Sequence, residues 1–150
     1  MKIGIISDTH SLLRTEAIAA LTGCDAIVHA GDIGEPGVLD ELRALAPLTV
    51  IRGNIDKWAL DLPDTVSVEF EGRRFYILHD LKALDFDPHE AGYHGVISGH
   101  SHMPKIARRD GVLYLNPGSA GPRRFKLPVA LARMRVTGQR IVAEIVKLPI

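Results

Sequence analysis

The stretch Ser98-Gly99-His100-Ser101-His102 follows a short apolar run and places two histidines one residue apart. The beginning of the chain is similar, because the apolar run Ile3–Ile6 is followed by Ser7-Asp8-Thr9-His10. In extended backbone, side chains two residues apart point to the same side. We therefore expect Asp8 with His10, and His100 with His102, to form two pairs of metal ligands at the ends of strands.

The composition is that of an ordinary globular protein, and 150 residues are enough for one domain with its own core, spanning 1–150. The 18 basic and 18 acidic residues balance, so no net field favours nucleic acid or an anionic membrane. No apolar run approaches the length of a membrane span, and the first residues read as a strand rather than as a signal peptide. We expect a cytoplasmic protein, and the composition leaves a homo-oligomer open.

Strands and helices are expected to alternate in the first third of the chain. Three apolar runs predict buried strands at Lys2–Ile6, Ala26–Val28 and Leu48–Ile51. Between them, apolar residues at helical spacing predict helices at Thr15–Leu21 and Pro36–Leu45. Such alternation favours right-handed βαβ units and a parallel sheet, with functional residues at the carboxyl ends of its strands.

The second half of the chain has the pattern of paired strands, in which short β-rich runs are separated by glycine-containing turns. The predicted hairpins are Thr65–Phe70 with Arg73–Leu78, Lys105–Arg109 with Val112–Leu115, and Val129–Val136 with Arg140–Lys147, and a further strand is predicted at Gly95–Ser98. The segment Leu81–Tyr93 is weakly patterned and predicts a short helix and a loop. Together these elements predict an α/β fold of two sheets packed face to face with helices outside.

Seven oxygen and nitrogen donors follow the predicted strands: Asp8, His10, Asp32, Asn54, His79, His100 and His102. This number is too large for one tetrahedral zinc ion and suits two metal ions that share a ligand. Asp32 is the candidate for the shared ligand, because a carboxylate bridges two cations well and the preceding Gly31 allows close approach of the backbone. Carboxylate, imidazole and amide donors suit manganese, iron, nickel or catalytic zinc and do not choose among them.

This ordered set resembles the calcineurin-like metallophosphoesterase superfamily, in particular the small bacterial and archaeal phosphodiesterases related to the retromer subunit Vps29. The blocks that carry the resemblance are Asp8-Thr9-His10, Gly31-Asp32, Gly53-Asn54, His79 and Gly99-His100-Ser101-His102. The resemblance implies a four-layer α-β-β-α sandwich built on two mixed sheets. It also implies one metal ion on Asp8, His10, Asp32 and His102, and a second on Asp32, Asn54, His79 and His100.

The activity implied by the resemblance is hydrolysis of a phosphodiester, with phosphatase activity as an addition, by attack of a hydroxide that bridges two divalent ions. Manganese is the ion we expect first, with nickel, zinc, iron or magnesium as alternatives, and the expected substrate is a small phosphodiester or nucleotide-like molecule. The alternative is a non-catalytic scaffold like Vps29 that binds proteins and retains a metal site.

The sequence departs from the family pattern at two positions. Many members have a histidine after the Gly-Asn pair, where it protonates the leaving group, whereas this chain has Ile55. We therefore expect poor leaving groups to be hydrolysed slowly and activated aryl or nucleotide leaving groups better. Asp80 stands where members usually have glycine, which raises a question about the backbone after His79.

Some polar residues near these blocks also have plain structural explanations. Asn54 alone could be a turn residue, and Asp8 or Thr9 alone could cap a helix. We expect Asp56 to cap a loop and His29 to be a hydrogen-bonded core histidine.

Overall fold

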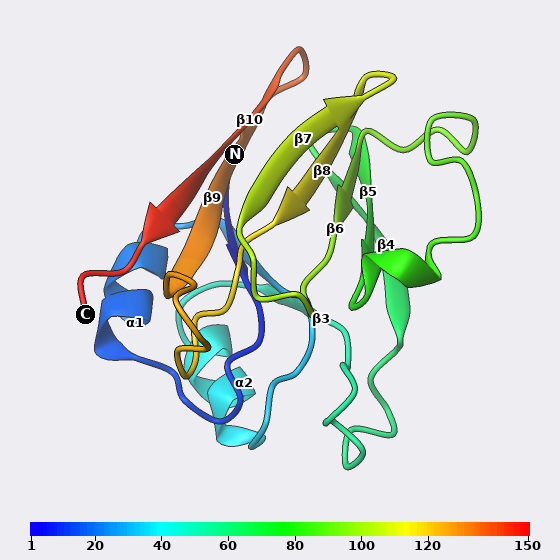
Figure 1. Ribbon diagram of the computed structural model, residues 1–150. Helices are drawn as coiled ribbons and strands as arrows, with labels where there is room; N and C mark the ends of the chain where they lie inside the picture. The colour runs from blue at the N-terminus through cyan, green and yellow to red at the C-terminus, as the bar shows by residue number, and fades with distance from the viewer.

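The chain forms two five-stranded sheets that pack face to face, and both α-helices lie on the outside of the same sheet (Figure 1). The computed structural model describes residues 1–150. The first sheet has the strand order β10-β9-β1-β2-β3 and the second has the order β4-β5-β6-β8-β7. The elements are β1 (Lys2–Ile6), α1 (Thr15–Leu21), β2 (Ala26–His29), α2 (Gly37–Arg43), β3 (Leu48–Val50), β4 (Thr65–Phe70), β5 (Arg73–Leu78), the 3₁₀ turn η1 (Leu81–Ala83), β6 (Gly95–Ile97), β7 (Lys105–Arg109), β8 (Val112–Asn116), β9 (Ala130–Val136) and β10 (Ile141–Lys147).

The first sheet is mixed, because β1, β2, β3 and β10 run in the same direction while β9, between β1 and β10, is antiparallel to both of its neighbours. Strand β1 is buried on both faces, which explains its continuous apolar sequence. On the outer face, Leu21 of α1 and Leu42 of α2 pack in one cluster with Ile6 and Ile27. On the inner face, Ile5 and other residues of the first sheet pack against the second sheet in a separate cluster of 16 buried residues.

The second sheet is also mixed, with parallel pairs β5–β6 and β6–β8 between the antiparallel hairpins β4–β5 and β7–β8. Both residues of each hairpin turn have positive φ, at Glu71-Gly72 and at Asp110-Gly111. This conformation matches the twist of two-residue hairpin loops and explains why glycine occupies the second position of both turns.

No α-helix covers the outer face of the second sheet. Instead, Leu81 of η1 and the following Leu84 pack on Leu78, Val96 and Val112. The two mixed sheets are therefore confirmed, while the fourth layer of the expected sandwich consists of one 3₁₀ turn and a loop. Neither α-helix is long and apolar enough to cross a bilayer.

The structure shifts several predicted boundaries. The second helix is Gly37–Arg43 rather than Pro36–Leu45, because Pro36 stands at its N-cap and the chain turns out of the helix at Ala44. Strand β2 extends to His29, and β3 and β6 each end one residue earlier than predicted. Strand β8 extends to Asn116, one residue beyond the predicted end at Leu115.

Candidate metal centre

The predicted ligands meet at one edge of the molecule, where the carboxyl ends of strands from both sheets lie together. Asp8, Asp32 and Asn54 follow β1, β2 and β3 of the first sheet, while His79 follows β5 of the second. His100 and His102 follow β6. Parallel strands direct their carboxyl ends to the same edge, so face-to-face packing of the sheets brings these distant segments together.

Six of the seven predicted ligands form two groups of three, and within each group the ligand atoms lie within 4.8 Å of one another. The first group is Asp8, His10 and His102, and the second is Asp32, His79 and His100. The carboxylate of Asp32 lies between the groups, because its Oδ2 is 3.5 Å from Nε2 of His10 and 3.3 Å from Nε2 of His79. The histidines of the Gly99–His102 stretch thus belong to different groups.

Four buried side-chain atoms have no hydrogen-bond partner: Asp8 Oδ1, His10 Nε2, His79 Nε2 and His102 Nδ1. A buried polar atom without a partner costs about 1–3 kcal/mol. All four belong to predicted ligands, and Asp8 Oδ1 lies 3.9 Å from Nε2 of both His10 and His79. Nε2 of His102 also lies 3.4 Å from Asp8 Oδ1. A carboxylate oxygen surrounded by imidazole nitrogens in this way fits a divalent cation, and metal binding by these residues stays a prediction.

The backbone of the site differs from the expectation. Asp8, His10, Asp32, His100 and His102 all have positive φ, between 44° and 70°. The prediction that alternation in extended backbone aligns each pair is therefore wrong, because left-handed turns after the strands direct these side chains inward. Such a conformation costs a non-glycine residue about 1–3 kcal/mol and concentrates at functional sites.

Asp8 is held so that only one of its oxygens is free. Its Oδ2 accepts hydrogen bonds from the Ser7 hydroxyl at 2.7 Å and the His100 backbone N–H at 3.1 Å. Gly99 allows this arrangement, because a Cβ there would collide with Ser7 Oγ and lie 2.7 Å from Asp8 Oδ2. The loop that carries His100 is thereby fixed to Asp8 of the first group.

His79 is oriented by a backbone carbonyl. Its Nδ1 donates to Ala30 O at 2.7 Å, which leaves Nε2 directed toward Asp32. Burial disfavours the charged ring, but the nearby Asp32 carboxylate, the hydrogen bond to Ala30 O and the charge of Asp8 outweigh it and raise the pKa of His79. Burial would raise the pKa of Asp32, but His79, the Ile55 N–H and His10 lower that pKa to about 2.

Asp56 ties together the loops after β2 and β3. Its buried carboxylate accepts from the N–H groups of Ile33 at 3.0 Å, Gly34 at 3.1 Å and Gly53 at 2.8 Å. The prediction of a loop-capping role is confirmed, but no sequence signal indicated that Asp56 joins two loops. Because those loops carry Asp32 and Asn54, Asp56 positions predicted ligands without contacting the open atoms.

His29 is a buried, hydrogen-bonded core histidine, as predicted. The Gly31 N–H donates to its Nδ1 at 3.1 Å, so Nε2 carries the proton and donates to Thr9 Oγ1 at 3.0 Å. The Thr9 hydroxyl in turn donates to Ile33 O. Burial lowers the pKa of His29 to about 4, in keeping with a neutral ring.

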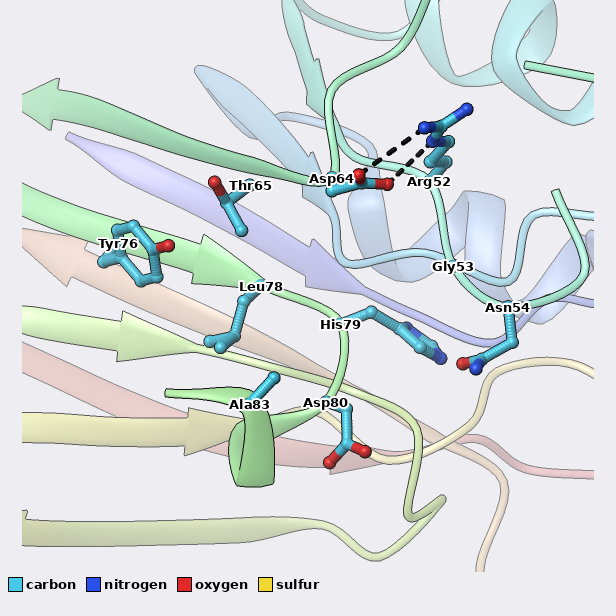
Figure 2. Close-up of a pocket in the computed structure, with 10 residues that line it drawn as sticks. All are labelled: Arg52, Gly53, Asn54, Asp64, Thr65, Tyr76, Leu78, His79, Asp80 and Ala83. Carbon is cyan, nitrogen blue, oxygen red and sulfur yellow. Dashed lines mark hydrogen bonds and ion pairs between the residues drawn. The ribbon is translucent and has the colours of Figure 1, made fainter. Parts of the chain in front are cut away.

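Asn54 lies in an open cleft of about 290 Å³ beside His79, and Figure 2 shows its amide next to the imidazole. Arg52 and Asp64 form an ion pair in the wall of the same cleft, with 2.7 Å between Arg52 Nε and Asp64 Oδ1. Asp80 points away from His79 (Figure 2). It caps η1, because its Oδ1 accepts a hydrogen bond from the Lys82 N–H. Its φ of −108° is accessible to any residue, so the missing glycine does not distort the backbone.

Comparisons with known proteins identify the family of this chain. A family model described as the calcineurin-like phosphoesterase superfamily domain matches residues 1–139. A probable metallophosphoesterase of Methanothermobacter thermautotrophicus is 34% identical, over 98% of this chain and 92% of the relative. A phosphodiesterase of Methanocaldococcus jannaschii is 32% identical, over 79% of this chain and 83% of the relative.

Among solved structures, Vps29 of Entamoeba histolytica in complex with Zn²⁺ has the same fold, with a TM-score of 0.77 and 20% identity over 98% of this chain and 99% of that chain. The family match covers most of the sequence and includes every predicted ligand. The chain therefore belongs to the calcineurin-like phosphoesterase superfamily.

Proposed function

We propose that this protein is a phosphodiesterase that works with two divalent metal ions and hydrolyses small or nucleotide-like phosphodiesters. The observation that carries the proposal is the position of Asp32 Oδ2 between the two groups of ligands. The relative from Methanocaldococcus jannaschii that is named a phosphodiesterase supports the same class of reaction.

In this proposal, Asp8, His10 and His102 would hold one ion, His79, His100 and Asn54 would hold the other, and Asp32 would be a ligand of both. When bound, two divalent ions would acidify water and neutralise the charge of a phosphate ester. Donors of oxygen and nitrogen without thiolate suit Mn²⁺ first, with Ni²⁺, Zn²⁺, iron or Mg²⁺ as alternatives.

The protein itself contributes positioning and charge. Two carboxylates against two divalent cations would leave the site net positive, which favours an anionic phosphate. Ser7 is buried and its hydroxyl donates a hydrogen bond to Asp8 Oδ2, so Ser7 is not available as a nucleophile. The preset hydrogen bonds on Asp8 and His79 mean that the ligands need little reorganisation.

The leaving group receives no proton from residue 55, because Ile55 is apolar and contributes only its backbone N–H to Asp32 at 3.2 Å. Diesters with activated leaving groups should therefore be hydrolysed better than esters of simple alcohols. This preference favours phosphodiesterase activity over general phosphatase activity.

The test is hydrolysis of bis(4-nitrophenyl) phosphate by chelated protein to which Mn²⁺, Ni²⁺, Zn²⁺ or Mg²⁺ is returned. We expect no turnover after chelation, recovery with at least one ion, and a loss of at least about 100-fold in Asp32→Ala. The matched control is Asp85→Ala, because Asp85 is an exposed carboxylate outside the site. Absence of turnover with every ion, or equal turnover in Asp32→Ala, would refute the proposal.

A scaffold function is the second candidate, supported by exposed apolar residues on the loop after β3. Ile55, Trp58 and Leu60 are 44%, 42% and 80% exposed. A scaffold would bind metal without turnover in the same assay, and the triple change of these residues to serine would leave metal binding intact.

A further inference from the structure

A second cavity, of about 600 Å³, opens beside His100 and does not include Asn54 in its lining. It is lined by η1, by the loop from Ser98 to Met103 and by parts of β7 and β8. Asp80 borders both this cavity and the cleft at Asn54. The cavity is therefore continuous with the surroundings of the candidate metal centre, although it contains none of its ligands except His100.

The cavity exists because the outer face of the second sheet has no α-helix. Register places Lys105 opposite Asn116 and Ala107 opposite Tyr114, so Lys105 and Tyr114 point to the same face of the sheet. The partly buried Tyr114 packs with Leu81 in the apolar cluster on that face. The Arg109 guanidinium lies 4.4 Å from the centre of the Tyr114 ring and holds the ring in place.

The lining combines an apolar wall with hydrogen-bond donors. Leu81, Tyr114 and the half-exposed Met103 provide apolar surface. Lys82 and Lys105 provide ammonium donors. The hydroxyl of Ser101 already accepts from Met103 N–H and the Asn116 amide, so its own proton is free to be donated.

Acceptors are scarce among the side chains of this cavity. The amide of Asn116 is already occupied within the protein. Its Nδ2 donates to Gly99 O and Ser101 Oγ, and its Oδ1 accepts from the Gly118 N–H. Asp80 provides the one carboxylate of the lining, and its Oδ2 lies 3.8 Å from His100 Nε2. The cavity is thus suited to a group with a flat apolar ring, several acceptors and a few hydroxyl donors.

We propose that this pocket binds the nucleoside of a nucleotide phosphodiester whose phosphate lies at the metal centre, an inference that rests on the proposed function. A base has a flat ring for Tyr114 and Met103 and carbonyl acceptors for the two lysines. A hydroxyl group of the sugar can donate a hydrogen bond to the carboxylate of Asp80. The volume also fits, since pockets for small ligands usually measure about 300–1,000 Å³.

The kinetic test compares two diesters with the same leaving group, thymidine 5′-(4-nitrophenyl phosphate) and methyl 4-nitrophenyl phosphate. We expect kcat/KM of wild type to be at least about tenfold higher for the thymidine ester, because only this ester fills the pocket. Lys105→Ala should reduce that ratio by about fivefold to tenfold through loss of a charged donor. The matched control is Lys126→Ala, which removes an exposed lysine outside the pocket and should leave the ratio unchanged.

The binding test uses thymidine alone and metal-free protein, with backbone amide shifts as the readout. We expect thymidine to shift the amides of Ser101, Met103 and Tyr114, and Lys105→Ala to weaken the binding. Equal kcat/KM for both diesters, with no amide shifts, overturns the pocket assignment and leaves the proposed function intact. If neither diester reacts, the proposed function fails, and the amide shifts alone decide whether the pocket binds a nucleoside. Shifts at these residues then support the pocket assignment, and their absence overturns it.

Discussion

Substitution of Asp56 tests how the ligand-bearing loops are held together. In Asp56→Ala, the backbone N–H groups of Ile33, Gly34 and Gly53 lose their acceptor. A buried donor without a partner costs about 1–3 kcal/mol, and we expect a total of about 3–5 kcal/mol because Gly34 and Gly53 are partly exposed. At this chain length, each kcal/mol lowers Tm by about 2–4 °C, so the expected decrease in Tm is about 6–20 °C.

The assay is urea unfolding of chelated protein, so that the free energy of unfolding does not include metal binding. Asp56→Asn keeps one carbonyl oxygen as an acceptor and should lose about 1–2 kcal/mol. Asp85→Ala, which removes an exposed carboxylate, should change stability by less than about 0.5 kcal/mol. A loss below about 1 kcal/mol in Asp56→Ala would refute the assignment of Asp56 as the link between the two loops.

Three further predictions concern the site. Ile55→His should raise monoester relative to diester turnover by about tenfold or more, because it supplies a proton to the leaving group; an unchanged ratio would refute this argument. In a metal titration, His102→Ala should weaken binding at the site of Asp8 and His10, and His100→Ala should weaken binding at the site of Asp32 and His79. Identical losses in the two variants would contradict the division into two groups. Metal affinity should fall as pH decreases from 8 to 6, by up to about tenfold per pH unit, because the raised pKa of His79 lets a proton compete with the metal for Nε2. Asp32, with its pKa of about 2, stays ionised over this range. A pH-independent Kd from calorimetry would contradict this assignment.

The sequence predicted most of the secondary structure because its signals are local. Continuous apolar runs marked the buried strands, and the turns Glu71-Gly72 and Asp110-Gly111 marked hairpins whose bounds agree closely with the structure. The pairing of β9 with β1 could not be read in this way, because it depends on contacts between opposite ends of the chain. The absence of an α-helix over the second sheet was also hidden, since Leu81 and Leu84 give too short a pattern to define a layer.

The candidate site was predicted by residue type and order, but its geometry was not. Period-two alternation gave an incorrect reason for the pairing of Asp8 with His10, because both residues have positive φ. The orienting contacts could not be predicted either. The acceptor for His79 is a carbonyl of Ala30 that no side-chain motif marks, and Ser7 before Asp8 resembles any small residue at a strand end.

The number of metal ions per chain tests the central claim most directly. Chelated protein is dialysed against Mn²⁺, and bound metal is measured by inductively coupled plasma mass spectrometry for wild type, Asp32→Ala and Asp85→Ala. Because Asp32 lies between the two groups of ligands, we expect two ions in wild type and in Asp85→Ala, and one or none in Asp32→Ala. One ion or none in wild type, or two ions in Asp32→Ala, would contradict a dinuclear centre bridged by this carboxylate.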